Sequence, residues 1–234
     1  AGGIVAVMWH WRDPSKRSSS FSPTPDEYGQ QALFDLSELV AGKHADGTYV
    51  YATETEEYKN LMEDIAAAKA ELQTLAEAGI PVLWRPLHEA SGGWFWWGAK
   101  GPDACKALWM LLRREMADLH NLVWVWTVQT HASFGAEVQW YPGQEQVDIV
   151  GVDIYEETHG SFAEAFKYAA EVSGSKKVLT LAECGAMPDP DKMYAEGATW
   201  AYCMPWYGDH TQSDVYNGAD YWKKMMNDGR VIVR

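Results

Sequence analysis

The sequence has little cysteine, few basic residues and no long hydrophobic run. Three cysteines, Cys105, Cys184 and Cys203, are too few for a disulfide framework, and none of them forms a CxxC pair. No stretch of about 18 apolar residues occurs, so no membrane-spanning helix is predicted. Nineteen Lys and Arg stand against 33 Asp and Glu, and the formal net charge is −14. Such a chain repels phosphates, so we expect neither a nucleic-acid nor a membrane partner.

Two families of functional motif are also absent. No glycine-rich phosphate loop follows a predicted strand, which disfavours a nucleotide-binding sheet. The pair His88-Glu89 is not followed by the second histidine of a zinc motif, because position 92 is glycine. We therefore expect no catalytic metal and no cofactor. No signal peptide is visible, which is compatible with a secreted protein whose leader has been removed.

Tryptophan, in contrast, is abundant. The chain has 13 Trp in 234 residues, more than a core of this size needs. Some of these side chains are therefore expected to form binding surfaces. Flat aromatic surfaces on an acidic chain suit a neutral substrate such as a sugar polymer. The length fits one large domain of barrel or open-sheet type, or at most two small ones.

Strand and helix patterns alternate along the chain. Apolar strand segments are predicted at 3–11, 81–89, 122–127, 147–155, 178–185 and 200–206. Helices are predicted at 26–40, 58–78, 102–120, 161–172 and 217–228. Gly79 stands where a C-terminal helix cap is expected, and Pro102 where a helix begins. Residues 12–25 form a long polar loop. Continuously apolar strands between helices are typical of a parallel sheet covered on both faces.

Polar residues gather where the predicted strands end. Such a gathering at the carboxyl ends of parallel strands is typical of a (β/α)8 TIM barrel. Six strands are visible instead of eight, so we interpret them as strands three to eight, with the first two βα units missing from this sequence. His131 and His159 follow strand ends as weaker binding candidates. The stronger candidates at strand ends are His10, His88, Glu89, Thr127, Asp153, Tyr155, Glu183 and Trp206.

Two glutamates are candidates for paired acid–base chemistry. Glu89 ends a strand and precedes the aromatic run Trp94–Trp97, while Glu183 ends the strand VLTLAECG. Strand alternation places Glu183 on one face with two leucines, at the predicted top of the barrel. The same alternation places His88 on the opposite face from Glu89, so a local bulge is needed if both serve one site. Paired carboxylates of this kind cleave glycosidic bonds.

The chain resembles glycoside hydrolase family 26, whose best-known members are retaining endo-β-1,4-mannanases. The resemblance is carried by RPLHEASGGWFWWG (85–98), VGVDIYE (150–156), LAECG (181–185) and the early WHW (9–11). It implies a (β/α)8 catalytic domain over residues 1–234, N-terminally incomplete. The roles that it implies are acid/base for Glu89, nucleophile for Glu183, and substrate binding for His10, His88, Trp94, Tyr155 and Trp206.

The resemblance also implies a mechanism and a substrate. Two glutamates about 5–5.5 Å apart would hydrolyse internal β-1,4-mannosidic bonds of mannan, glucomannan or galactomannan by double displacement. A secreted, periplasmic or cell-surface monomer would act on such a polysaccharide. Tyr207 departs from the arginine of some members, which affects the outer subsites. Open alternatives are a β-1,3-xylanase or mixed-linkage glucanase of the same family, and a non-catalytic carbohydrate-binding fragment.

Purely structural roles remain alternatives for the same residues. Glu89 could form a salt bridge to Arg85, and His88 could be a satisfied core histidine. The aromatics Trp94–Trp97 cannot all line a groove, and two of them are expected in the core. Structural alternatives also apply to Tyr155, Glu183 and Trp206. Asp153 is interpreted as a hydrogen-bonding residue that supports the site.

Overall fold

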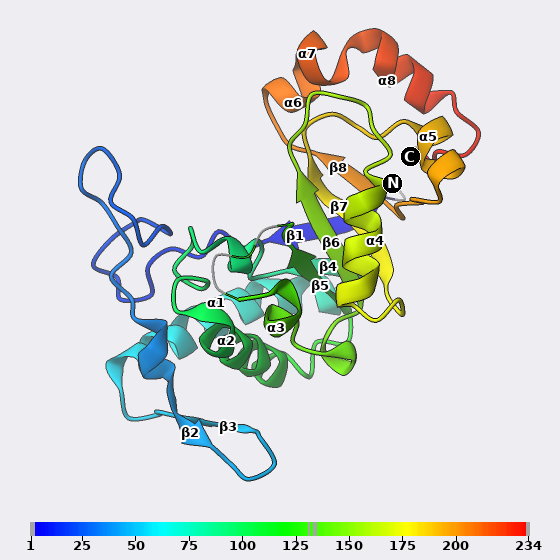
Figure 1. Ribbon diagram of the computed structural model, residues 1–234. Helices are drawn as coiled ribbons and strands as arrows, with labels where there is room; N and C mark the ends of the chain where they lie inside the picture. Colours follow the sequence, from blue (N-terminus) through cyan, green and yellow to red (C-terminus); the bar gives the residue numbers. More distant parts are fainter. Residues whose placement is uncertain (1–2, 131, 133–134, 233–234) are drawn as a thin grey trace. The chain divides into compact units, whose positions relative to one another are not determined.

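The computed structural model describes residues 3–130, 132 and 135–232, so His131 lies outside the described residues. The chain forms two compact units, Ile4–Val147 and Asp148–Arg234, the second together with residues 1–3. They are called here the N-terminal and the C-terminal unit, and Figure 1 labels their elements. Within the described residues, no helix is both long and apolar enough to span a bilayer.

Three parallel strands form the sheet of the N-terminal unit, in the order β1 (Val5–Met8), β4 (Val82–Arg85) and β5 (Leu122–Val128). Val5 lies opposite Val82, and Val82 lies opposite Leu122. The parallel pairing confirms the prediction for these segments. The long helices α1 (Glu56–Glu77) and α2 (Gly101–Glu115) connect the strands.

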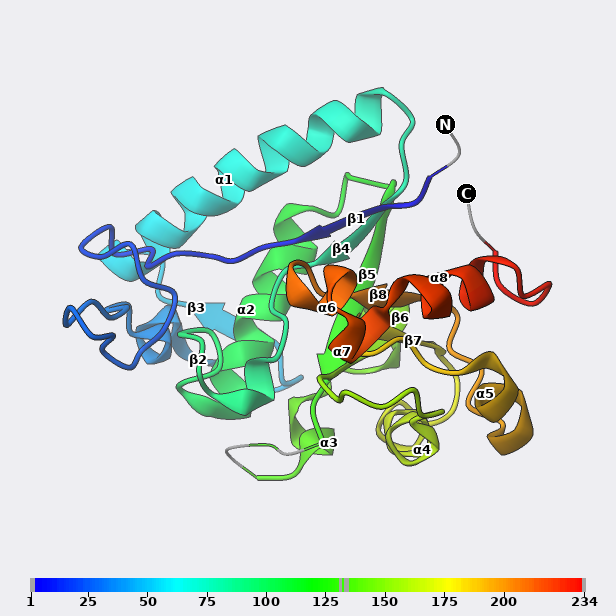
Figure 2. The same cartoon turned by 90° about the horizontal axis from the view of Figure 1, so that it is seen from above.

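Helix α1 forms for the reasons that its sequence suggested. Thr55 caps its first turn by accepting a hydrogen bond from the backbone of Tyr58. Its buried positions Leu61, Ile65 and Leu72 recur along one face. Gly79 ends the helix at φ +67°, a left-handed conformation that favours glycine. In Figure 2 this helix runs beside β1.

The predicted helix at 26–40 is wrong. Asp26 accepts hydrogen bonds from the backbone amides of Tyr28 and Gln30, which bends the chain locally and competes with helix formation. Only a short 3-10 helix, η1 (Leu36–Leu39), forms in this segment. A hairpin of β2 (Val40–Lys43) and β3 (Tyr49–Tyr51) follows and projects from its unit in Figure 1.

Smaller elements complete the N-terminal unit. The 3-10 helix η2 (Ala90–Gly92) follows β4, and the short helix α3 (Glu137–Trp140) follows β5. Helix α3 packs against both η2 and α2. The 3-10 helix η3 (Gln144–Gln146) lies near the end of the unit. These short elements connect the loop after β4 to the helical layer.

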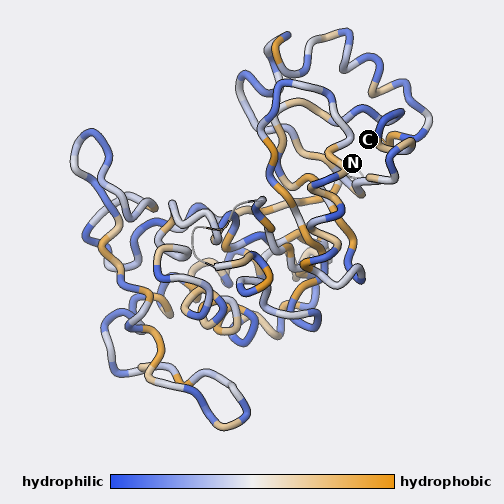
Figure 3. The backbone as a smooth tube through the Cα atoms, in the orientation of Figure 1, coloured by the Kyte–Doolittle hydropathy of each residue, from blue (hydrophilic) through white to orange (hydrophobic). Residues whose placement is uncertain are grey.

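The C-terminal unit has its own three parallel strands, β6 (Ile149–Ile154), β7 (Val178–Cys184) and β8 (Cys203–Pro205). The hydrophobic colour of β6 and β7 in Figure 3 agrees with their apolar sequences. These strands confirm the parallel strand–helix alternation. The helices of this unit are α4 (Ala163–Val172), α5 (Pro190–Glu196), α6 (Asp209–Gln212), α7 (Asp214–Asn217) and α8 (Ala219–Met226).

All three cysteines are free. Burial raises the pKa of the Cys105 and Cys184 thiols above its usual range. It also raises the pKa of the Cys203 thiol to about 12.

Candidate functional site

Glu89 does not lie on a strand, which corrects the predicted strand 81–89. Strand β4 ends at Arg85, and the chain then turns. Glu89 itself has φ 52° and ψ 28°, the left-handed region that a non-glycine residue rarely adopts. Such a conformation costs on the order of 1–3 kcal/mol and is typical of functional sites. The predicted bulge is unnecessary, because strand alternation no longer applies at His88 and Glu89.

The carboxylate of Glu89 is held by the indole of Trp94. Trp94 Nε1 donates to Glu89 Oε2 over 2.9 Å. Trp94 is 44% exposed, so one aromatic surface stands at the molecular surface beside the acid. An acid next to an accessible aromatic ring is the arrangement that the sequence predicted for sugar binding.

Two glycines make this loop possible for different reasons. A Cβ on Gly92 would lie 2.1 Å from the Trp94 ring, and a Cβ on Gly98 would lie 1.9 Å from the backbone oxygen of Ala90. The partly exposed indole can move away. The backbone of Ala90, which is buried, cannot move without disturbing the turn that carries Glu89.

The two corresponding alanine variants should therefore behave differently. Gly98→Ala is expected to destabilise the protein by about 1–3 kcal/mol through overpacking, a fall in melting temperature of roughly 2–10 °C. Gly92→Ala should leave the melting temperature nearly unchanged but break the Trp94–Glu89 hydrogen bond. Thermal melts of both variants check this, and equal melting temperatures would contradict the backbone clash at Gly98.

The other three aromatics of the run are buried. Phe95, Trp96 and Trp97 are 6%, 1% and 0% exposed, so three residues are in the core where two were expected. Trp96 Nε1 donates to the backbone oxygen of Trp11, and Trp97 Nε1 donates to that of His88. The aromatic run therefore fastens the loop after β4 to the end of β1 and to the turn before Glu89.

The structure also brings His10 and His88 together. Their ring centroids lie 4.6 Å apart in an edge-to-face arrangement, and Phe95 packs against both rings. Burial lowers the pKa of His88 to about 2, with smaller contributions from Arg85 and His10. His88 is 2% exposed and stays uncharged at any ordinary pH. A neutral imidazole can orient a neighbouring group without adding charge.

Glu183 lies near the end of β7 in the C-terminal unit. It is 3% exposed, and it accepts a short hydrogen bond from the hydroxyl of Tyr155. Asp153 lies opposite it in the parallel pairing of β6 with β7, next to a register shift. The structure thus brings together two of the predicted site residues, Glu183 and Tyr155.

Trp206 lies just beyond β8 and is half-buried. Its backbone amide donates to the carbonyl of Cys184, the residue after Glu183. Its ring centroid lies 5.3 Å from that of Tyr207. The predicted residues Tyr155, Glu183 and Trp206 thus belong to neighbouring parts of one unit.

Sequence reasoning missed two residues of the C-terminal unit. The ring centroid of His210 lies 5.2 Å from that of Tyr155. Asn217 is 1% exposed and ties the segment after β7 together. It donates to the backbone oxygen of Gly185 and accepts from the amide of Met187, both over 2.8 Å. No local pattern marks an asparagine at the end of a short helix whose partners lie 30 and 32 residues away in the sequence.

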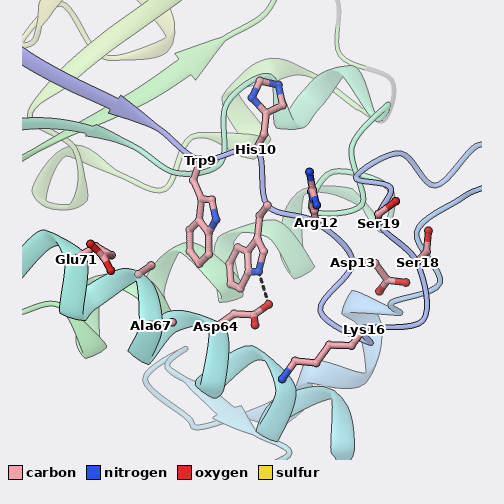
Figure 4. A pocket seen from close by; sticks show the side chains of 12 residues that line it. Trp9, His10, Arg12, Asp13, Lys16, Ser18, Ser19, Asp64, Ala67 and Glu71 are labelled. Atoms are coloured by element: carbon pink, nitrogen blue, oxygen red, sulfur yellow. Dashed lines mark hydrogen bonds between the residues drawn. The ribbon is translucent and has the colours of Figure 1, made fainter.

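A pocket of about 590 Å³ lies between the end of β1, the loop after it and helix α1. Figure 4 shows Trp9 and His10 pointing to opposite sides of the chain. Trp9 stacks on Trp11 with ring centroids 3.9 Å apart, and Trp11 Nε1 donates to Asp64 Oδ2 over 2.8 Å. The exposed His10 is therefore separated from an indole pair that faces α1.

The predicted site residues are divided between the two units. His10, His88, Glu89 and Trp94 belong to the N-terminal unit, and Tyr155, Glu183 and Trp206 belong to the C-terminal unit. The distance of about 5–5.5 Å predicted between the carboxyl groups of Glu89 and Glu183 is a distance between different units, so it stays a prediction. The absence of a metal and of a cofactor also stays a prediction.

Comparison with known sequences gives one family over the whole chain. Residues 1–234 match the profile of Glycosyl hydrolase family 26. A mannan endo-1,4-beta-mannosidase of Thermothelomyces thermophilus is 34% identical over 99% of this chain and 45% of its own length. Mannan endo-1,4-beta-mannosidase A of a Piromyces species is 30% identical over 98% of this chain and 34% of its own length. The chain thus spans less than half of these curated relatives.

Comparison with solved structures agrees. The β-mannanase from a symbiotic protist of the termite Reticulitermes speratus, solved with a gluco-manno-oligosaccharide, is 38% identical with a TM-score of 0.86, covering 99% of this chain and 67% of that one. The Podospora anserina GH26-CBM35 β-(1,4)-mannanase is 33% identical with a TM-score of 0.83, covering 99% of this chain and 49% of that one.

Proposed function

Because the chain belongs to glycosyl hydrolase family 26, we propose that it is the catalytic part of a retaining endo-β-1,4-mannanase. The observation that carries this proposal is the position of the two predicted glutamates. Each lies at or just beyond the carboxyl end of a parallel strand, Glu89 after β4 and Glu183 at β7, and each accepts a hydrogen bond from an aromatic residue. The mannanase names of the similar proteins support the substrate class.

In the proposed first step, Glu183 attacks the anomeric carbon and Glu89 gives its proton to the departing glycosidic oxygen. The bond to the leaving sugar breaks, and a covalent glycosyl ester forms on Glu183. In the second step Glu89 takes a proton from water, whose oxygen attacks the same carbon and displaces Glu183. Two inversions leave the anomeric configuration unchanged.

The remaining predicted residues bind and orient the sugar in this proposal. Trp94 offers its exposed ring beside the acid, and His10 offers an exposed imidazole. His88 is buried, so it acts through the turn that carries Glu89. In the C-terminal unit, Tyr155 orients Glu183 through its hydrogen bond, and the half-buried Trp206 packs against a pyranose ring.

We propose that residues 1–234 belong to a (β/α)8 barrel, of which they contribute strands three to eight. Two further βα units would pack on the outer edge of β1, which is the outermost strand of its sheet among the described residues. An apolar pocket of about 210 Å³ lies where β1 meets α1 and β4. Its lining residues are Val7 and Met8 of β1, Trp9 just after this strand, Ala68, Glu71 and Leu72 of α1, and Trp84 of β4.

The proposed substrate is mannan, glucomannan or galactomannan, and the protein would act on it as a secreted, periplasmic or cell-surface monomer without metal or cofactor. A net charge of −14 favours an uncharged polysaccharide over nucleic acid or an anionic membrane. The family also leaves β-1,3-xylanase and mixed-linkage glucanase activity as candidates, since the two-carboxylate mechanism does not distinguish between them.

Incubation with locust-bean gum, lichenan and β-1,3-xylan tests the proposal. Reducing ends should appear from locust-bean gum, and NMR should show that the first product has the β configuration. Release from lichenan or β-1,3-xylan alone would assign one of the other activities. Binding without release from any of the three would make the chain a carbohydrate-binding fragment.

A further inference from the structure

Glu137, the first residue of α3, is a buried carboxyl that the proposed mechanism does not use. It is 1% exposed, although it begins a short helix directly after a loop. Helix α3 packs against η2, the turn that follows Glu89, and against α2. Glu137 therefore belongs to a helix that packs against the turn after the proposed acid/base residue, within the same unit.

The polar groups around Glu137 are few and complementary. The side chain of Ser91 in η2 and the backbone amide of Gln129 lie close enough to favour its charged form, while burial opposes that form. Among the described residues, neither Glu137 oxygen completes a hydrogen bond of good geometry, and the same holds for Ser91 Oγ and Gln129 Nε2. The Ser91 hydroxyl and the Gln129 backbone amide are thus the two donors beside this buried carboxyl, which has an oxygen for each.

Ser91 links this cluster to the proposed catalytic acid. It is the second residue after Glu89, in a turn closed by hydrogen bonds from the Gly92 amide to the Glu89 carbonyl and from the Gly93 amide to the Ala90 carbonyl. Glu89 begins this turn in the left-handed conformation. Holding Ser91 in place therefore restricts the backbone angles that aim the Glu89 side chain.

We propose that Glu137 is a positioning residue for Glu89. The carboxyl of Glu137 anchors Ser91 and thereby keeps Glu89, in the turn after β4, in its left-handed backbone conformation. The proposal rests on the proposed function only in treating Glu89 as the acid/base. Ionisation strengthens the hydrogen bond from Ser91, but burial disfavours the charge by more, so the packing of Glu137 against the turn is most stable when the carboxyl is protonated. Ionisation places a charge where only Ser91 and Gln129 can stabilise it.

Ionisation of Glu137 gives the anchor a pH dependence. Burial raises the pKa of Glu137 from 4.5 to about 7. In α2, the titratable group that faces Glu137 is the Cys105 thiol, whose own pKa is raised. The 3-10 helix η2 consists of Ala90, Ser91 and Gly92 and adds no charged side chain. The folded chain holds the Glu137 proton more tightly than the unfolded chain, so the anchor is intact at low pH. It weakens as pH rises between these values.

The experiment has a catalytic arm and a structural arm. For the wild type, Glu137→Gln, Glu137→Ala and Ser91→Ala, kcat and KM are measured from pH 5 to 9 on galactomannan and on an aryl mannoside with a good leaving group. Glu145→Gln, at an exposed position of η3, is the matched control. Hydrogen exchange of the Gly92 and Gly93 amides reports on the turn itself, without depending on catalysis.

Glu137→Ala and Ser91→Ala should lower kcat on galactomannan by on the order of 10- to 100-fold through misplacement of the acid. On the aryl mannoside, whose leaving group needs little protonation, they should spare the first step, seen as a pre-steady-state burst of aryl release, and slow only the second step, which needs Glu89 as base. Glu137→Gln should retain most activity and lose the part of the pH profile centred near 7. Loss of the burst in Glu137→Ala and Ser91→Ala, or an unchanged pH profile in Glu137→Gln, would overturn the proposal.

Hydrogen exchange distinguishes a failure of the Glu137 anchor from a failure of the proposed function. Faster exchange of the Gly92 amide in Glu137→Ala and Ser91→Ala is expected, with Glu145→Gln like the wild type. A wild type that hydrolyses no glycan would defeat the proposed function, and faster exchange would then still support the anchor. Unchanged exchange in both variants would overturn the anchor whatever the activity.

Discussion

Replacement of Glu183 by glutamine should abolish hydrolysis of galactomannan, lowering kcat by on the order of 10⁴-fold or more. The amide cannot attack the anomeric carbon, so the covalent step on which turnover depends is lost. Glutamine keeps the size of the side chain and can still accept the hydrogen bond from Tyr155. Initial rates on galactomannan, together with thermal melts that show an intact fold, measure the effect.

A labelling experiment identifies the nucleophile directly. A 2-deoxy-2-fluoro-mannosyl substrate with a good leaving group should accumulate an ester on Glu183, visible as a mass increase of the peptide that contains it. Glu156→Gln, at an exposed position next to Tyr155, is the control and should be labelled like the wild type. A label on any other carboxylate would remove Glu183 from the nucleophile role.

Replacement of Glu89 by alanine should affect substrates according to their leaving groups. On galactomannan, loss of the general acid should lower kcat by about 10²–10⁴-fold. An aryl mannoside with a good leaving group needs no proton in the first step, so its glycosyl-enzyme should still form and then accumulate. A pre-steady-state burst of aryl release, followed by slow turnover, is the expected signature.

Azide provides a second measurement for the Glu89 variant. This small anion needs no general base, so it should restore turnover of the aryl mannoside and give a β-mannosyl azide. Glu77→Ala, at the exposed end of α1, should show neither the burst nor the rescue. Full activity of Glu89→Ala on the polymer would refute the assignment of Glu89.

Local signals predicted much of the secondary structure. Helix α1 has a capping threonine, a regular apolar face and a terminal glycine, and it forms close to the predicted range. Strand β5 likewise follows its apolar run. The segment 26–40 misled the prediction because the Asp26 side chain accepts hydrogen bonds from the backbone amides of Tyr28 and Gln30, which favours a turn. The hairpin of β2 and β3 had an overlooked signal, since Asp46-Gly47 is a common hairpin turn.

The sequence predicted which residues form the site better than it predicted their backbone conformations. Strand ends followed by acids pointed to Glu89 and Glu183, and the family resemblance supplied Tyr155. The left-handed conformation at Glu89 was not predictable, because it depends on packing of the loop by Trp96 and Trp97. Contacts made by His210 and Asn217 arise from distant parts of the chain, which local periodicity does not encode.

The state of the three thiols has a practical consequence for spectroscopy. Cys105 and Cys184 are buried, and every cysteine has a raised pKa, so little thiolate is present at neutral pH. Maleimide reagents should therefore modify the native protein slowly. A single cysteine introduced at an exposed position of the hairpin, such as Gly42, could be labelled selectively with a fluorophore or spin label without first removing the natural cysteines.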